Sequence, residues 1–455
     1  MPPWSLDEGG NLRARWASNK IGIGGLIGRA ADHFPVGPSK EGNVESLTIL
    51  LGLLLLAATV WDHFRLRRAL LEQNFAARTS RLRSAMARKP GDQRWPSITV
   101  VRPVRGLDVD AAKNLAAALD NDYPGDVETI FVFDDDLDPG FATVRKAIAA
   151  HAAAGARGTA TIMVAGQPPP TMTGKLHAMI AGLGQATGEL VAFGDSDTRP
   201  HPYSLRLAVE KLLTTERAGS VFVPVVASET PRTAGDVGVA LMLNGLYGPA
   251  VARTVSKTGE MPFIMGQLMV FPRETLKALR DLQNVSGELV DDMRMGMDVV
   301  AAGYRNVVSA DTLPIVVRGL GLAEFVRMFR RWLIFSRSGL PTWSFKLPVW
   351  LRGAEFWLGF LMTALALSYG QYAAAIPAAA TVVAVSASIV GLHRVLGGAA
   401  IGWRHAWVPA AVLLAGPLLL LSAILKPEVT WRGRTYQLDA RSKLHRPEPA
   451  HAHRP

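Results

Sequence analysis

Two aspartates separated by one residue follow a strongly apolar run, with Asp195 and Asp197 directly after residues 190–194. If that run is a buried parallel strand, both side chains emerge at the carboxyl edge of the sheet, where α/β proteins bind ligands. Carboxylates at this spacing can reach one hard cation such as Mg²⁺ or Mn²⁺, which substrate phosphates usually complete. The sequence therefore predicts a metal site at Asp195 and Asp197. A helix N-cap or Asx turn is the alternative.

Other charged residues follow further apolar runs. Asp134 begins a group of four carboxylates within five positions, which repel one another unless a cation or a donor-rich ligand offsets them. Part of this group is expected to cap a helix that starts at Pro139. Asp108 ends the motif Arg-Pro-Val-Arg-Gly-Leu-Asp. Lys175 follows a glycine at the start of a predicted helix, a position suited to a phosphate oxygen.

A last acidic pair, Asp291 and Asp292, opens a helical stretch over 290–302. Either carboxylate could act as a general base if burial or its neighbour raises its pKa. The alternative is a structural one, in which negative charge at a helix N-terminus complements the helix dipole.

The elements that must position these residues lie between about 96 and 310, where β-rich runs alternate with Ala-rich helical stretches. Strands are expected at 97–102, 127–133, 159–164, 190–194 and 220–226, and helices at 109–120, 139–154, 175–187 and 201–216. Near-continuous apolar strands between helices predict an α/β, doubly wound domain with a mostly parallel sheet.

Apolar segments flank this domain. Residues 44–61 just suffice to cross a bilayer, although a buried soluble helix is an alternative. The arginines that follow would lie in the cytoplasm by the positive-inside rule. Further spans are predicted at 354–370, 373–393 and 406–425, where Ala-Gly-Pro at 415–417 could break the last one into a re-entrant pair.

The predicted organisation divides the chain into seven parts. They are a disordered tail (1–43), a transmembrane anchor (44–64), a basic linker (65–95), a catalytic domain (96–321), amphipathic helices at the membrane interface (322–352), transmembrane helices (353–425) and a basic tail (426–455).

The composition excludes some classes of site and partner. The 455 residues contain 49 Lys and Arg, 38 Asp and Glu, and no cysteine, so disulfides and thiolate nucleophiles are excluded. We interpret the formal net charge of +11 as positive-inside bias rather than as a nucleic-acid surface. No nucleic-acid partner is expected, and nothing in the sequence indicates an oligomeric state.

The motifs, taken in order, resemble the ceramide glucosyltransferase family within the family-2 glycosyltransferases of GT-A fold. They are Arg-Pro-Val-Arg-Gly-Leu-Asp, Gly-Lys, Asp-Ser-Asp, Met-Gly-Gln, Asp-Asp and Arg-Arg-Trp. By this resemblance Asp108, Asp195 and Asp292 occupy the places of the family's three aspartates, with Asp292 the catalytic base. Arg331 and Trp332 match the end of the family's last motif, whose first position is here Met328.

The resemblance implies an inverting transfer from a nucleotide sugar, UDP-hexose or UDP-N-acetylhexosamine, to a membrane-lipid hydroxyl of ceramide-like or hopanoid-like type. A multi-pass protein of a bacterial inner membrane, with a cytoplasmic catalytic domain, is expected. Asp108 and Asp134 would hold the uridine, and Asp195 and Asp197 the metal. The UDP leaving group would meet the remaining donor-site residues, Lys175, Arg330, Arg331 and Trp332.

Alternatives remain open at this stage. Trp332 could instead anchor the chain at the membrane interface. The protein could be a processive polysaccharide synthase, or a non-catalytic membrane protein that kept the fold. A nucleotidyltransferase is less favoured, because the Gly-rich phosphate loop is missing.

Overall fold

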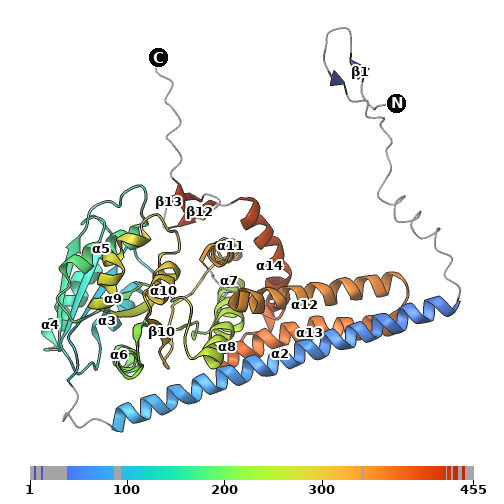
Figure 1. Ribbon diagram of the computed structural model, residues 1–455, viewed down its shortest axis with the longest axis horizontal. Coiled ribbons are helices and arrows are strands. Elements are labelled where there is room, and N and C mark those ends of the chain that lie inside the picture. The colour runs from blue at the N-terminus through green and yellow to red at the C-terminus, as the bar shows by residue number, and fades with distance from the viewer. Residues whose placement is uncertain are drawn as a thin grey trace.

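The computed structural model describes residues 5–6, 12–13, 38–86, 94–339, 343–426, 428–431, 434–438 and 443–445 (Figure 1). Most of the predicted tail 1–43, the linker residues 87–93 and the end of the predicted tail 426–455 lie outside these ranges. Near the N-terminus, β1 (Ser5–Leu6) and β2 (Leu12–Arg13) pair in an antiparallel manner.

A seven-stranded sheet forms the centre of the predicted catalytic domain, in the order β10-β7-β9-β6-β3-β4-β5. Only β9 runs antiparallel to its neighbours, so the predicted α/β fold with a mostly parallel sheet is confirmed. The strands are β3 (Ile98–Pro103), β4 (Val127–Phe133), β5 (Thr159–Val164), β6 (Leu190–Gly194), β7 (Ala218–Phe222), β9 (Leu268–Pro272) and β10 (Arg305–Val308).

Strands β9 and β10 were not predicted from the sequence. The last predicted strand, 220–226, is in fact divided between β7 and β8 (Val225–Val226), and β8 pairs with β11 (Leu313–Pro314) outside the main sheet. Pro224 lies between the two pieces and has no backbone N–H to donate, which explains the break.

Helices cover both faces of the sheet, as the alternation of side chains along β4 shows. Phe131 and Phe133 pack in a cluster with α3 and α4, whereas Ile130 and Val132 belong to the main core with α5. The helices of this domain are α3 (Ala111–Leu119), α4 (Gly140–Ala153), α5 (Gly174–Gln185), α6 (Ser204–Thr214), α7 (Ala234–Leu241), the π-helix η1 (Met242–Tyr247), α8 (Gly248–Thr258), α9 (Arg273–Ala278), η2 (Arg280–Val285) and α10 (Asp291–Ala301).

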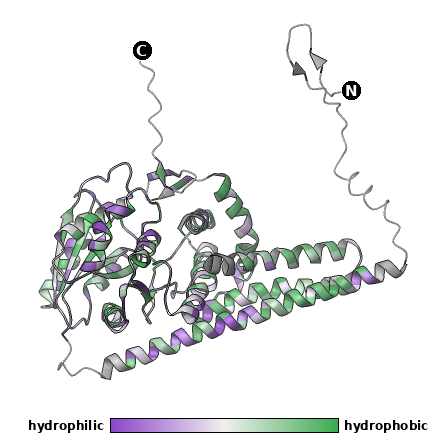
Figure 2. Ribbon diagram, in the orientation of Figure 1, coloured by the Kyte–Doolittle hydropathy of each residue, from purple (hydrophilic) through white to green (hydrophobic). Residues whose placement is uncertain are grey.

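Beside the domain lie the long apolar helices. They are α2 (Pro38–Met86), α12 (Trp343–Ser368), α13 (Tyr372–Val395) and α14 (Val408–Leu425), with the short turn η3 (Trp403–His405) before α14. Hydrophobic residues are concentrated on α12 to α14 and on the N-terminal half of α2 (Figure 2). The predicted anchor and most of the predicted basic linker therefore form one continuous helix, α2.

Within the described parts of the chain, three segments are long and apolar enough to cross a membrane: Asn43–Leu82, Tyr372–Val395 and Trp403–Leu425. Most of the predicted span 354–370 falls in α12, which is not among them. The predicted re-entrant break at 415–417 is wrong, since α14 continues through Pro417 as one helix.

The amphipathic stretch predicted at 322–352 divides into α11 (Leu322–Gly339) and the start of α12. The apolar side of α11 is buried in the protein, with Phe325 packed so closely that a Cβ on Gly238 of α7 would lie 2.7 Å from its ring. Packing against the protein therefore accounts for the apolar side of α11. The membrane-interface position of 322–352 stays a prediction.

The predicted basic tail begins with a folded element. Strands β12 (Glu428–Trp431), β13 (Arg434–Leu438) and β14 (Leu444–His445) form an antiparallel ribbon. The ribbon returns to the catalytic domain, where the backbone N–H of Leu444 donates to the carbonyl of Gly287 at 2.8 Å. We refer below to residues 428–445 as the C-terminal ribbon.

A buried group of charges joins α2 to the domain. Asp62 of α2 accepts from Arg352 of α12 and, at 3.3 Å, from Arg253 of α8. The Arg352 side chain is 2% exposed and also lies 3.3 Å from Glu355. Buried ion pairs contribute little net stability when intact, but the loss of one partner is costly.

We expect Asp62→Ala to lower the free energy of unfolding by about 3 kcal/mol, because it takes the carboxylate away from two largely buried arginines. Arg68→Gln on the same helix removes only an exposed pair with Glu72 and should cost less than about 1 kcal/mol. Thermal unfolding of the purified protein in detergent measures both. Equal effects of the two substitutions would contradict the structural role of Asp62.

Candidate active site

A cavity of about 430 Å³ opens at the carboxyl edge of the sheet, between the strand ends, α11 and the C-terminal ribbon. Its volume is within the range of small-molecule binding sites. Most of the residues that the sequence singled out line it: Asp108, Asp134, Lys175, Asp195, Asp197, Asp292, Arg331 and Trp332.

Lys175 lies at the centre of the charged part of the cavity. Its Nζ is 2.7 Å from Asp195 Oδ1 and donates to the carbonyl of Gly266 at 2.9 Å. Burial alone would lower the pKa of Lys175, but the carboxylates of Asp195, Asp291 and Asp292 outweigh burial and raise it. The lysine therefore stays protonated and holds together acidic residues from β6 and α10.

The acidic pair at the start of α10 is held by backbone donors. Asp292 Oδ2 accepts from the N–H of Gly266 at 2.7 Å, and Asp292 Oδ1 from that of Met293 at 2.8 Å. Burial raises the pKa of Asp291 to about 7, and it also raises the pKa of Asp292, while Lys175 opposes both shifts. A carboxylate so placed is a stronger base than an exposed one.

Gly266 leaves the space for this arrangement. A Cβ at residue 266 would lie 2.8 Å from Asp292 Oδ2 and 3.0 Å from Lys175 Nζ. The glycine thus allows the Asp292 carboxylate and the Lys175 ammonium to approach the backbone of residue 266. This close approach explains why the Met-Gly-Gln motif has a glycine at its centre.

The metal-site candidates lie in the loop after β6. Asp195 is held at its backbone, where its N–H donates to the carbonyl of Gln267 at 2.9 Å. Between the two aspartates, the Ser196 hydroxyl donates to Asp108 Oδ2 at 2.6 Å. Arg102 lies fully buried behind them, and burial lowers its pKa to about 10, against the opposing charges of Asp195, Asp197 and Asp108.

The acidic turn after β4 divides into structural and cavity-facing residues. Asp138 accepts from the N–H groups of Gly106 and Gly140, so it has the capping role that the sequence allowed. Asp134 instead faces the cavity, and its Oδ2 lies 2.9 Å from Arg105 Nη1.

Arg330, which the sequence assigned to the donor site, does not line the cavity. Its guanidinium donates to the carbonyl of Glu428, at 2.8 Å, and to that of Lys426. Successive helical residues point about 100° apart, so Arg331 faces the cavity while Arg330 holds the start of the C-terminal ribbon. Trp332 also lines the cavity, 5.2 Å from the Tyr247 ring between centroids.

Sequence reasoning missed the contribution of the C-terminal ribbon. Arg434 and Tyr436 line the cavity, and Arg434 Nη2 lies 3.2 Å from Asp134 Oδ2. Residues 434–438 alternate inward and outward, which was a usable strand signal. Nothing in the sequence, however, indicated that this strand, about 260 residues beyond Lys175, would pack beside the cavity.

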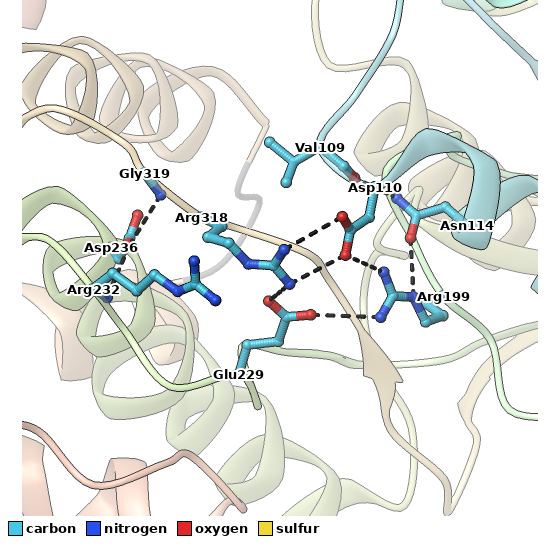
Figure 3. A network of polar contacts seen from close by, with 9 residues as sticks. All are labelled: Val109, Asp110, Asn114, Arg199, Glu229, Arg232, Asp236, Arg318 and Gly319. Carbon is cyan, nitrogen blue, oxygen red and sulfur yellow. Dashed lines mark hydrogen bonds and ion pairs between the residues drawn. The ribbon is translucent and has the colours of Figure 1, made fainter.

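A network of ion pairs ties the loops around the cavity together (Figure 3). The guanidinium of Arg318, itself a lining residue, bonds Asp110 at 3.1 Å and Glu229 at 2.9 Å. Arg199, two residues after Asp197, bonds the same Asp110 at 3.1 Å. The network thus fixes the loop after β6, which carries Asp195 and Asp197, against the segment 315–320, which forms a wall of the cavity.

The far half of the cavity is apolar. Its side chains come from α7, η1 and α11, together with neighbouring loops, and include Val239, Met242, Leu243, Tyr247, Met265, Leu320, Met328 and Trp332. These elements pack against the long apolar helices, since a Cβ on Gly245 of η1 would lie 2.7 Å from the Ile389 carbonyl of α13. The lining of one cavity therefore combines charged residues from the strand ends with apolar residues from elements that adjoin candidate membrane helices.

We expect Lys175→Met to destabilise the protein more at pH 8 than at pH 5. Without the ammonium group, the buried carboxylates of Asp291 and Asp292 have pKa values raised further, so the folded state is penalised as pH rises. Unfolding of both proteins at the two pH values measures this difference. Lys113→Met, at an exposed site, is the control, and a pH-independent effect of Lys175→Met would contradict the prediction.

Comparison with known proteins gives related sequences and structures. The chain is similar to an N-acetylglucosaminyltransferase of Rhizobium meliloti, 25% identical over 287 residues, which are 61% of this chain and 63% of that relative's length. Among solved structures, it is similar to a mannosyltransferase from Pyrobaculum calidifontis in complex with GDP-Man and Mn²⁺ (21% identity, 81% of this chain, 99% of that chain, TM-score 0.41). It is also similar to glucosyl-3-phosphoglycerate synthase from Mycobacterium tuberculosis in complex with Mg²⁺ and UDP (18%, 55% and 81%, TM-score 0.32).

Residues 56–444 match glycosyl transferase family 21. This match covers most of the chain and agrees with the resemblance to ceramide glucosyltransferases. The protein therefore belongs to glycosyl transferase family 21.

Proposed function

We propose that this enzyme transfers a hexose or N-acetylhexosamine, with inversion, from a UDP-sugar to the hydroxyl of a membrane lipid of ceramide-like or hopanoid-like type. The observation that carries the proposal is the two-ended cavity. Its charged end suits a nucleoside diphosphate, and its apolar end suits a lipid chain next to helices that could cross a membrane.

Asp292 lies where these two ends meet. Its carboxylate bonds Gly266, whose neighbour Met265 lines the apolar half, and Lys175 also bonds Gly266 on the charged side. In the proposed reaction Asp292 takes the proton of the lipid hydroxyl as its oxygen attacks the anomeric carbon of the sugar. The bond from that carbon to the diphosphate breaks, and UDP leaves with the electron pair.

The departing diphosphate needs positive charge. Lys175 is buried and protonated at the charged end, and Arg331 lines the same cavity. Asp108 and Asp134 lie along its wall, where we propose that they hold the uridine. Trp332 packs on the apolar side and would close the donor site against the acceptor chain.

A divalent cation fits this site only together with the donor. Asp195 and Asp197 supply carboxylate oxygens, but in the described part of the chain no group of three His, Cys, Asp or Glu side chains could hold a metal ion. Mg²⁺ and Mn²⁺ are commonly bound by one or two carboxylates and completed by phosphates. When bound, the ion would neutralise charge on the leaving diphosphate.

The C-terminal ribbon bears on membrane topology. Because the ribbon lines the cavity of the catalytic domain, both lie on one side of any membrane, so the chain crosses an even number of times between residues 321 and 428. Three crossings in this interval, as predicted from the sequence, do not meet that condition, whereas two do. The arginines after Trp61 support a cytoplasmic location for the catalytic side.

We expect Asp292→Asn to lower kcat by about 10²- to 10⁴-fold, the usual contribution of a general base, with little change in UDP binding. The assay compares lipid extracts by mass spectrometry from cells that lack the gene and carry either form. Wild type should add one hexose or N-acetylhexosamine to a lipid, and Asp292→Asn should not.

Asp136→Asn, in the exposed part of the acidic turn, is the matched control and should behave as wild type. A long polysaccharide product would favour a processive synthase instead. Unchanged glycolipids on gene deletion would refute the lipid acceptor.

We also expect Mn²⁺ to bind at least about ten-fold more tightly in the presence of UDP than alone, because the two aspartates leave the remaining coordination to phosphate oxygens. Titration calorimetry of wild type and of Asp197→Asn measures this coupling. Tight Mn²⁺ binding without nucleotide, unaffected by Asp197→Asn, would argue against this site.

A further inference from the structure

We propose that Arg434 of the C-terminal ribbon is a donor-binding residue, whose guanidinium binds the nucleoside diphosphate of the nucleotide sugar. This inference rests on the proposed function and adds to it a residue that lies outside the predicted catalytic domain. It makes the last part of the chain a component of the donor site.

The guanidinium of Arg434 is aimed into the charged end of the cavity. Its Nη2 lies 2.8 Å from Gln167 Oε1 and 3.2 Å from Asp134 Oδ2, and its side chain is 23% exposed. Arg105 reaches the same Oδ2 of Asp134 from the other strand end, at 2.9 Å. Two guanidinium groups thus share one carboxylate, and these three side chains carry a formal charge of 2 − 1 = +1.

The start of α5 is shaped around this guanidinium. A Cβ on Gly174 would lie 2.5 Å from Arg434 Nη1, and Lys175 follows in the chain. Two cations therefore lie at the N-terminal end of a helix, where the helix dipole disfavours positive charge and favours an anion. A diphosphate bound among Lys175, Arg434 and the first N–H groups of α5 would relieve that repulsion.

Other residues hold the ribbon in place. Val429 and Leu438 are buried in a cluster with Leu289, Val290 and Ile334. Leu444 is bonded to Gly287, and Arg330 holds the carbonyl of Glu428. The fold of the ribbon thus depends on contacts that do not involve Arg434, so a substitution at residue 434 tests binding rather than folding.

The test is calorimetric titration of the full-length protein in detergent with UDP and Mn²⁺. We expect Arg434→Gln to weaken UDP binding at least about ten-fold, and to raise KM for the donor but not KM for the lipid acceptor. Arg434→Lys should retain part of the affinity. Lys443→Gln removes a charge from the same ribbon outside the cavity and should bind UDP as wild type does.

A second variant approaches the same contact from the other side. Gly174→Ala should displace the Arg434 guanidinium and weaken UDP binding, although alanine is the better residue for a helix. If both changes act through one contact, the double variant binds little worse than Arg434→Gln alone.

The outcomes separate the two proposals. Wild type that binds neither UDP nor GDP with Mn²⁺ would refute the proposed function. Wild type that binds UDP, together with an Arg434→Gln variant of equal affinity and unchanged thermal stability, would overturn the role of Arg434 alone. Should Arg434→Gln fail to fold, Arg434→Lys and Gly174→Ala decide the question by the same measurement.

Discussion

The crowding of carboxylates at one edge of the sheet is the constraint on which the site depends. Six aspartates line one cavity: Asp108, Asp134, Asp195, Asp197, Asp291 and Asp292. Like charges at this density are tolerated only if cations are interleaved among them. Lys175 does so for three of the six, Arg102 lies behind Asp195 and Asp197, and Arg105 and Arg434 share Asp134.

These cations come from parts of the chain that are far apart, and the architecture has to bring them together. Lys175 opens α5, and the cavity-facing Arg331 lies on α11, whose neighbour Arg330 holds the ribbon that carries Arg434. The charge balance of the cavity is therefore coupled to the return of the chain after the apolar helices. If these helices cross a membrane, the same return requires an even number of crossings between domain and ribbon.

The cavity also explains why one protein would join membrane helices to a nucleotide-sugar site. Its apolar half is built on α7, η1 and α11, and η1 packs directly on α13. A lipid hydroxyl could reach Asp292 from this side without its chain entering water, which would cost about 0.8 kcal/mol per exposed CH₂. The backbone of Gly266, which bonds both Asp292 and Lys175, links the two halves.

The sequence by itself determined the local elements and the chemistry at their ends. The runs at 127–133, 159–164 and 190–194 are strands with the predicted bounds, because apolar periodicity is a local signal. Asp134 and Asp195, which directly follow the first and the last of these strands, line the cavity as the strand-end rule predicts. The sequence-based prediction missed β9, the antiparallel strand, because a five-residue apolar run does not show which strands it will pair with. Only the tertiary structure decided that Arg331 rather than Arg330 faces the cavity, and that Arg434 joins Asp134 from 300 residues away. The packing of α11 decides which of the two arginines faces the cavity, and the path of the chain after the apolar helices brings Arg434 to Asp134. Both depend on the burial of apolar surface between segments that are far apart in the sequence, which no local pattern encodes.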